Sequence, residues 1–171
     1  MGTKNENNLR AAPTIADLVT VNKRLIEEEI SSKTIEQFIE LLTVHKKHER
    51  YVHLLTALCT CGNEAIMQKQ NDIIEHLLDN EKNRNILILP IRGHPPLGVP
   101  DKLEVLCNEV WHDVREFRHF SFENDRGRLY HYYIALADLA AALCFSRNYR
   151  AIAHFEEVYP YEVVYSIIGD P

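Results

Sequence analysis

The chain has 171 residues, a formal net charge of −6 at pH 7 and a hydrophobic fraction of 46%. This length and composition are typical of a globular chain that buries a core without disulfide staples, and they exclude a disordered protein. An acidic balance also excludes broad binding to a phosphate backbone, so we expect no nucleic-acid partner.

No stretch has the pattern of a signal peptide or a membrane span. Residues 1–12 are polar, and we expect them to form a flexible N-terminal tail. The longest apolar run, residues 134–145, is shorter than a span and is interrupted by Asp138. We therefore expect no direct membrane contact.

Four amphipathic helices are predicted between residues 13 and 78, where apolar residues recur at helical spacing. Pro13 and Thr14 begin the first helix, which is expected to reach about residue 30, and Ser31 and Ser32 then break it and cap the second. The third is expected to begin at about Glu49 and to end near Gly62 and Asn63, residue types that accept a left-handed backbone. The inward residues are Ile15, Leu18, Val19, Ile26 and Ile30 in the first helix; Ile35, Phe38, Ile39 and Leu42 in the second; Tyr51, Leu54, Leu55 and Leu58 in the third; and Ile66, Gln70, Ile73, Ile74, Leu77 and Leu78 in the fourth.

The second half of the chain begins with an interruption. Residues 79–100 are interpreted as an irregular proline-rich connection, within which residues 86–91 fit either a buried helical turn or an extended segment. Asp101 and Glu104 then have the spacing of a capping box, which predicts a helix of four turns. Its inward residues would be Leu103, Leu106, Cys107, Val110, Trp111, Val114 and Phe117.

Residues 123–127 are expected to form a loop before the most strongly helical segment, whose many alanines predict that it is the most buried helix. A tight turn at 146–148 leads into a seventh helix, which Pro160 ends. The expected inward residues are Leu129, Tyr132, Tyr133, Leu136, Ala140, Leu143 and Cys144, then Tyr149, Ile152, Ala153 and Phe155, and finally Tyr161, Val164, Tyr165 and Ile168 of a further helix.

These elements predict an all-α fold, an armadillo/HEAT-like α-solenoid of about seven to eight amphipathic helices. The domain organisation would be a tail, residues 1–12, and one solenoid segment, residues 13–171. Because no tight internal sequence repeat is present, a compact helical bundle stays open as the alternative.

Several residue groups invite a chemical interpretation, and each is more simply structural. Cys59 and Cys61 with His53 could suggest a metal site, but no second ligand pair is present. Residues two positions apart on one helix also point about 200° apart, so both thiolates could not face one ion. The spacing of His48-Glu49 with His53 is one residue too long for a zinc motif. The cysteines, which all lie in apolar helical patterns and favour free thiols in a reducing compartment, are Cys59, Cys61, Cys107 and Cys144.

The remaining groups are charged or aromatic. His112 and Asp113 beside Trp111 would be adjacent on a helix and would not face each other. The basic patch at residues 45–50 and the acidic Glu27–Glu29 are interpreted as solvated turns and helix ends. Tyr130, Tyr132 and Tyr133 are interpreted as a packing cluster, although a binding groove stays open. We therefore predict no catalytic, cofactor-binding or metal-binding residues, no cofactor and no enzyme activity.

Two stretches of the chain resemble a known family. The first, "TIADLVTVNKRLIEEEISSKTIEQFIELL" continuing through "RYVHLLTALCTCGNEAIMQKQNDIIEHLL", is similar to the RIH domain of inositol trisphosphate and ryanodine receptors. The second, "LYHYYIALADLAAALCFSRNYRAIAHFEEVYPYEVV", resembles a helix-turn-helix further along the same solenoid. The order and spacing of the two stretches are similar to those in inositol trisphosphate receptors, whereas ryanodine receptors resemble mainly the first stretch. The resemblance covers residues 14–78 and 129–168, and neither stretch is a chemical fingerprint.

The resemblance implies a segment of a calcium-release channel at the cytosolic face of the endoplasmic reticulum. It implies coupling of a ligand-binding region to the gate, with neighbouring solenoid and β-trefoil domains and the other subunits of a tetramer as partners. The basic ligand-binding residues of the family have no counterpart here, so we expect no inositol trisphosphate binding by this segment alone. A free-standing helical-repeat adaptor that binds another protein is the alternative.

Overall fold

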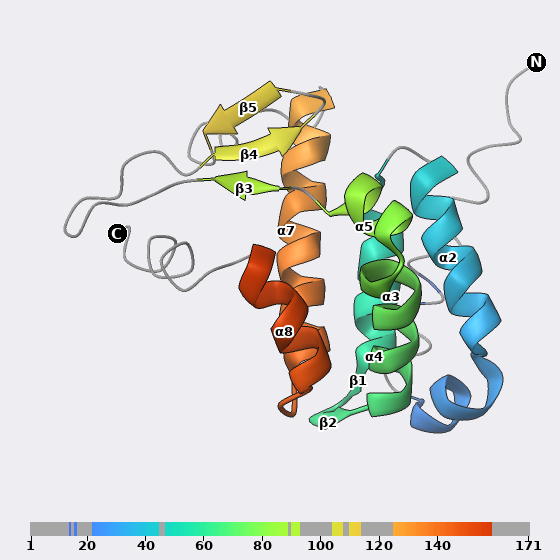
Figure 1. Ribbon diagram of the computed structural model, residues 1–171. Helices are drawn as coiled ribbons and strands as arrows, with labels where there is room; N and C mark the ends of the chain where they lie inside the picture. The colour runs from blue at the N-terminus through green and yellow to red at the C-terminus, as the bar shows by residue number, and fades with distance from the viewer. Residues whose placement is uncertain are drawn as a thin grey trace, which may run out of the picture.

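The computed structural model describes residues 14, 16, 22–44, 47–88, 90–92, 104–107, 110–113 and 125–158. Helices dominate these residues, and the strands form two small antiparallel sheets, so the predicted all-α class is confirmed. No helix in this part of the chain combines the length and the hydropathy that a bilayer crossing needs. The helices are η1 (Leu25–Glu29), α2 (Ser32–Val44), α3 (Glu49–Cys59), α4 (Met67–Ile73), η2 (Ile74–Asp79), α5 (Glu81–Leu87), α7 (Asp125–Cys144) and α8 (Tyr149–Val158) (Figure 1).

The longer helices form two stacked hairpins (Figure 1). In the first hairpin α3 is followed by α4, which continues without a break into the π-helical segment η2. In the second hairpin α7 is followed by α8. Helix α3 packs on α7 and η2 packs on α8, while α2 packs on both α3 and α4. Neighbouring hairpins that share one core in this way are the arrangement expected of an α-solenoid.

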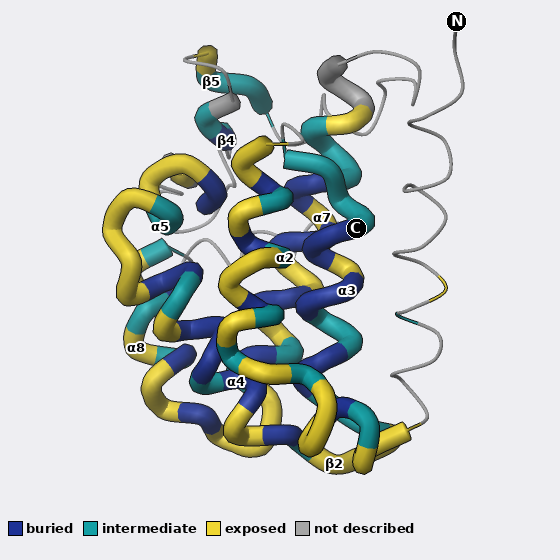
Figure 2. Tube along the Cα trace, turned by 90° about the vertical axis from the view of Figure 1, so that its right-hand side faces the viewer, coloured by how far each residue is buried: buried dark blue, intermediate teal, exposed yellow. Residues whose placement is uncertain are grey.

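The core lies between these helices and continues from one hairpin to the next. Figure 2 shows buried positions on the inward sides of α2, α3 and α4 and exposed positions on the outer turns of α2 and α5. The predicted inward faces of α2, α3 and α4 are confirmed, with Phe38 partly buried beside them. The predicted inward residues that are buried in these three helices and in the segments next to them are Ile35, Ile39, Leu42, Tyr51, Leu54, Leu55, Leu58, Ile66, Gln70, Ile73, Ile74, Leu77 and Leu78.

The predicted first helix, residues 13–30, is wrong as a single element. Thr14 and Ala16 are helical, but Asn22 is not, and a new helical segment begins after it. The Oδ1 atom of Asn22 accepts a hydrogen bond from the Leu25 backbone N–H at 3.1 Å. Asparagine favours such a cap over a helix interior, so the apolar spacing alone hid the break.

The third helix ends earlier than predicted, at Cys59 instead of Gly62. Residues Thr60–Cys61 (β1) pair with Glu64–Ala65 (β2) in a small hairpin. Gly62 has the predicted positive φ, 58°, but it serves as the first residue of a two-residue hairpin loop. The expected helical setting of Cys61 is therefore wrong.

The region after residue 79 also departs from the prediction. Helix α5 lies where an irregular connection was expected, and Asn80 caps it by accepting the Asn83 N–H at 3.1 Å. The apolar run predicted at residues 86–91 begins as the last two residues of α5 and ends in the extended residues Ile91–Arg92 (β3), so both alternatives hold for part of it.

The helix predicted from Asp101 is wrong in its described part. Residues Glu104–Cys107 (β4) and Val110–Asp113 (β5) pair as a hairpin, and β4 also pairs with β3. The apolar spacing fitted a helix, but Val105 and Val110 are β-branched residues, which favour strands. The resulting three-stranded sheet buries Val105 in the common core.

Helix α7 begins at Asp125, so the loop predicted for residues 123–127 is wrong from that point on. The seventh helix is confirmed as α8, although its buried residues are Ala151 and Phe155. The predicted inward positions of Tyr149 and Ala153 are wrong, because both residues are exposed. The predictions for residues 1–12, for the proline-rich stretch 93–100, for the patch residues His45 and Lys46 and for residues 159–171 lie outside the described residues.

Candidate functional site: the junction between the hairpins

Gln70 of α4 connects the two hairpins. Its side chain is fully buried, and its Nε2 donates hydrogen bonds to the carbonyl oxygens of Ala142 at 2.9 Å and Phe145 at 3.4 Å. These carbonyls belong to the end of α7, where a helix leaves its last C=O groups without partners. A side chain of the first hairpin therefore caps a helix of the second.

Asn148 completes this connection from the other side. Its Nδ2 donates to the Oε1 of Gln70 at 3.1 Å and to the Oδ1 of Asn71 at 3.3 Å. Its backbone carbonyl accepts the N–H of Ile152 at 3.0 Å, and its Oδ1 lies 3.5 Å from the N–H of Ala151, so Asn148 is the N-cap of α8. Asn148 is itself buried.

The turn that brings Asn148 to this position is unusual in its backbone. Ser146 and Arg147 have φ angles of 59° and 61°, a left-handed conformation that residues with a Cβ adopt at a cost. The sequence predicted a tight turn at 146–148, and this is confirmed. Two successive left-handed residues reverse the chain sharply enough for Asn148 to reach α4.

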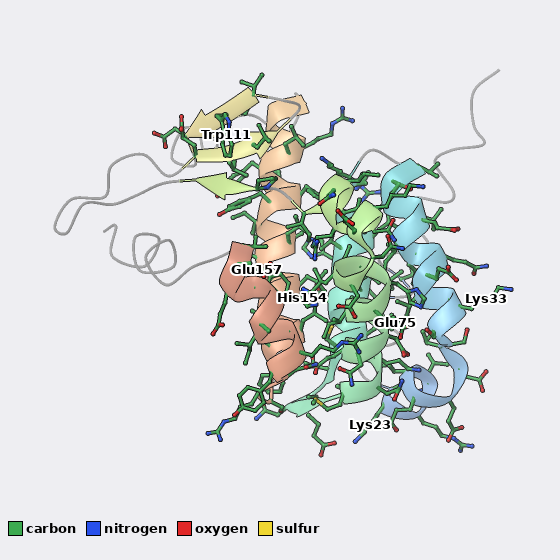
Figure 3. The ribbon with its side chains drawn as sticks, in the orientation of Figure 1. Lys23, Lys33, Glu75, Trp111, His154 and Glu157 are labelled. Atoms are coloured by element: carbon green, nitrogen blue, oxygen red, sulfur yellow. The ribbon has the colours of Figure 1, made fainter. Side chains whose placement is uncertain are left out.

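A second, more exposed contact joins η2 to α8. Asp79 accepts a hydrogen bond from Arg150, and its other carboxylate oxygen lies 2.6 Å from the Nε2 of His154. Figure 3 labels His154, which belongs to α8. Partial burial by itself would raise the pKa of Asp79, but the hydrogen bonds and positive charges of Arg150 and His154 outweigh it and lower the pKa below its ordinary value.

The same α4–η2 helix is bonded to the N-terminal helices. The buried Lys69 donates to the backbone carbonyl of Ile30, the residue that ends η1. His76 lies 2.8 Å from the hydroxyl of Ser32, the first residue of α2, through its Nε2. We call α4–η2 (Met67–Asp79) the hub helix, because it bonds to η1 and α2 on one side and to α7 and α8 on the other.

A further hydrogen bond fixes the N-terminal half of α7. The hydroxyl of Tyr132, a fully buried residue, donates to the Leu87 carbonyl at the end of α5 at 2.8 Å. Tyr133 is also buried, and this burial, followed by the charge of Tyr130, raises its pKa to about 12. The expected packing role of this tyrosine cluster is therefore confirmed. Every buried side-chain nitrogen and oxygen of the described residues has a partner.

The chemical candidates of the sequence do not come together. Within the described residues no three histidine, cysteine or carboxylate side chains are placed to hold a metal ion. Cys59 is buried on α3, where burial raises the pKa of its thiol, and Cys61 is on β1. His48 precedes α3 and caps it by accepting the Arg50 N–H at 3.4 Å.

The other candidates have structural surroundings as well. His112 and Asp113 lie on β5 and not on a helix, so their side chains point to opposite faces of a strand. Glu28 forms an exposed ion pair with Arg24 at 2.8 Å. Sequence reasoning counted Gln70 among the inward residues but missed its role, because a glutamine on an apolar face gives no sign of which carbonyls it meets.

The comparison with known families adds the decisive observation. Residues 6–90 match the model of the RIH domain, the domain named for ryanodine and inositol trisphosphate receptors. Residues 6–90 form an RIH domain of this receptor family. The match contains η1, α2, α3, the hub helix and α5, and it ends before α7 and α8. It covers a domain that both receptor types share and does not separate the two branches. The junction described above therefore joins the RIH helices to the helices that follow them.

Proposed function

We propose that this chain is part of the cytosolic helical solenoid of an inositol trisphosphate receptor-like calcium-release channel of the endoplasmic reticulum, and that it couples a ligand-binding region to the channel gate. The RIH match supports the channel family. The resemblance of residues 129–168 to a later part of the same solenoid favours the inositol trisphosphate branch. The partners would be the neighbouring solenoid and β-trefoil domains and the other subunits of the tetramer.

The observation that carries the coupling is the position of the hub helix. Its bonds from Lys69 and His76 hold the helices that precede it, and its bonds from Gln70 and Asp79 hold those that follow. A displacement of η1 and α2 would therefore strain hydrogen bonds at α7 and α8 unless those helices moved as well. Such a contiguous packed and hydrogen-bonded path is what energetic coupling through a solenoid requires.

The first experiment is to sequence the transcript on both sides of the region that encodes these residues. A β-trefoil upstream and membrane-spanning segments downstream would support the channel segment. Stop codons on both sides would support the alternative, a helical-repeat adaptor that binds another protein.

The second experiment measures ligand binding and coupling separately. We expect calorimetric titration of residues 1–171 with inositol trisphosphate to give no heat of binding, and micromolar binding would contradict this part of the proposal. In the complete polypeptide, Gln70→Leu should raise the ligand concentration for half-maximal calcium release about five-fold or more. The control Gln37→Leu changes an exposed glutamine of α2 and should leave that concentration unchanged. Equal release curves for both variants would contradict the coupling role.

A further inference from the structure

The turn between α7 and α8 carries exposed aromatic and basic side chains. Tyr149, the first residue of α8, is 72% exposed, and Phe145, just after α7, is 39% exposed. Among the described residues, the exposed side chain of Arg147 has neither a hydrogen-bonded nor an ionic partner. The neighbouring Arg150 is paired with Asp79, so Arg147 supplies the excess positive charge of this turn. Aromatic residues and arginine are enriched at protein–protein interfaces.

The backbone of the turn gives a second reason to expect a partner. Arg147 has a φ of 61°, a conformation in which glycine would be more stable because it has no Cβ. The turn is held in place because Gln70 bonds to the Phe145 carbonyl and Asn148 bonds back to Gln70. A turn that is already rigid loses little conformational freedom on binding, which favours association.

An acidic segment lies at the same end of the molecule. Figure 1 shows the β1–β2 hairpin at the lower end, between the α7–α8 turn and η1. The residues Glu27–Glu29 of η1 are all exposed. The two basic residues before η1 are already paired, Lys23 with Glu64 of β2 and Arg24 with Glu28. The other two carboxylates therefore give η1 an excess of negative charge.

The surface between the two charged groups is partly apolar. Met67, the first residue of α4, follows β2 by two residues and is 43% exposed. Methionine is flexible and is often used at binding surfaces. We call the surface formed by Phe145, Arg147, Tyr149, Met67 and Glu27–Glu29 the end face. It is basic at one edge, apolar in the middle and acidic at the other edge.

A surface with this order of charges is complementary to itself. A two-fold axis through its middle would place Arg147 of one copy opposite Glu27–Glu29 of the other, and the reverse contact would form at the same time. We propose that the end face binds a second copy of this chain in a two-fold symmetric dimer. This proposal does not depend on the channel function.

The test begins with sedimentation equilibrium of the full chain up to about 1 mM, a concentration at which a dimer with a millimolar Kd is half formed. Arg147→Glu should weaken the dimer about tenfold or more, because it places like charges opposite each other in both contacts. Raising NaCl from about 50 mM to about 500 mM should also weaken the unsubstituted dimer. The control Lys82→Glu changes an exposed cation of α5, at the other end of the molecule, and should leave Kd unchanged.

A charge exchange tests the two-fold arrangement itself. A variant with Glu27→Arg and Glu29→Arg should not self-associate, because its end face carries only positive charge at both edges. Mixed with the Arg147→Glu variant, it should form a heterodimer about as stable as the unsubstituted dimer, since both contacts then pair opposite charges. A fluorescent label on one variant follows the heterodimer during sedimentation.

Arg147→Gly separates loss of association from loss of folding. It removes the charge and also relieves the left-handed backbone, so it should raise Tm while weakening the dimer roughly five-fold or more.

Three outcomes would overturn the proposal. The first is a chain that stays monomeric at every concentration, and the second is a dimer that Arg147→Glu and Arg147→Gly leave unchanged. The third is a mixture of the charge-exchanged variants that stays monomeric although circular dichroism shows both to be folded.

Discussion

At the scale of single residues, buried polar side chains join the helices and apolar ones fill the space between them. Gln70 and Asn148 are buried and hydrogen-bonded to each other, and each also satisfies backbone groups at a helix end. An apolar replacement of either would take one hydrogen-bond partner from the buried amide of the other. The loss of a buried partner destabilises the fold, because no water replaces the lost hydrogen bond.

The first prediction concerns Gln70. Gln70→Leu should destabilise the chain by about 2–3 kcal/mol, because it removes buried hydrogen bonds from the carbonyls of Ala142 and Phe145 and from the amide of Asn148. Urea unfolding followed by circular dichroism measures this difference. Gln37→Leu, on the exposed side of α2, makes the same chemical change and should stay within about 0.5 kcal/mol of the unsubstituted chain. Equal effects of the two substitutions would disprove the junction role of Gln70.

The second prediction concerns Asp79 and pH. Because its pKa in the folded chain lies below the ordinary value of 3.8, ionised Asp79 stabilises the fold at neutral pH, and this stability is lost as pH falls below about 4. Asp79→Asn should therefore reduce the free energy of unfolding at pH 7 and make little difference near pH 3. The carboxylate is partly exposed, so solvent screening keeps the effect below about 1 kcal/mol.

The control for this prediction is Asp138→Asn on the exposed side of α7, which removes a carboxylate away from Arg150 and His154. The difference between the two variants, measured by urea unfolding at pH 7 and pH 3, isolates the contact between η2 and α8. A difference that grows on acidification would have the wrong sign for an ion pair.

At the scale of elements, the turn between α7 and α8 holds the backbone of two residues in a costly left-handed conformation. Ser146→Gly or Arg147→Gly should stabilise the chain by about 0.5–1 kcal/mol, because glycine adopts a positive φ without a Cβ penalty. Thermal unfolding measures the change. Ala153→Gly, inside α8, should destabilise by about 1 kcal/mol, since there the backbone is helical. A destabilising effect at both kinds of position would show that the left-handed turn is absent in solution.

The elements also show which structure the sequence can predict. Helices α2, α3 and α4 follow from apolar residues at helical spacing, because each buries one side and meets water on the other. The β4–β5 hairpin does not, since Val105, Leu106, Val110 and Trp111 fit a helical stripe as well as a strand pair. Its pairing with β3 depends on a contact between residues 91 and 105, which local spacing cannot reveal.

The candidate site was less predictable than the fold. The inward position of Gln70 followed from periodicity. Its partners did not, because the carbonyls of Ala142 and Phe145 lie 72 and 75 positions further along the chain. Backbone carbonyls have no sequence signature. The turn at 146–148 was predictable from its residue types, whereas the way it aims Asn148 at α4 depends on the packing of both hairpins.

At the scale of the whole molecule, one core runs through both hairpins and includes Val105 of the small sheet. The sequence has a single tryptophan, Trp111, which lies on β5. Its fluorescence therefore reports on the sheet, while far-ultraviolet circular dichroism reports on the helices. We expect both signals to change at the same urea concentration, as for a two-state transition.

Val105→Ala tests whether a change in the sheet also destabilises the helices. Because Val105 is fully buried in the common core, its truncation should lower both midpoints together. If only the fluorescence transition moves, the sheet unfolds separately from the helices.

The position of the hub helix has a consequence for how the family domain is to be expressed and studied. The RIH match ends at residue 90, yet Gln70 within it needs the carbonyls of residues 142 and 145, and α3 packs on α7. A recombinant fragment cut at the family boundary would display the leucines of α3 to solvent and would be prone to aggregate. The matched domain and the packed core thus have different ends in this chain.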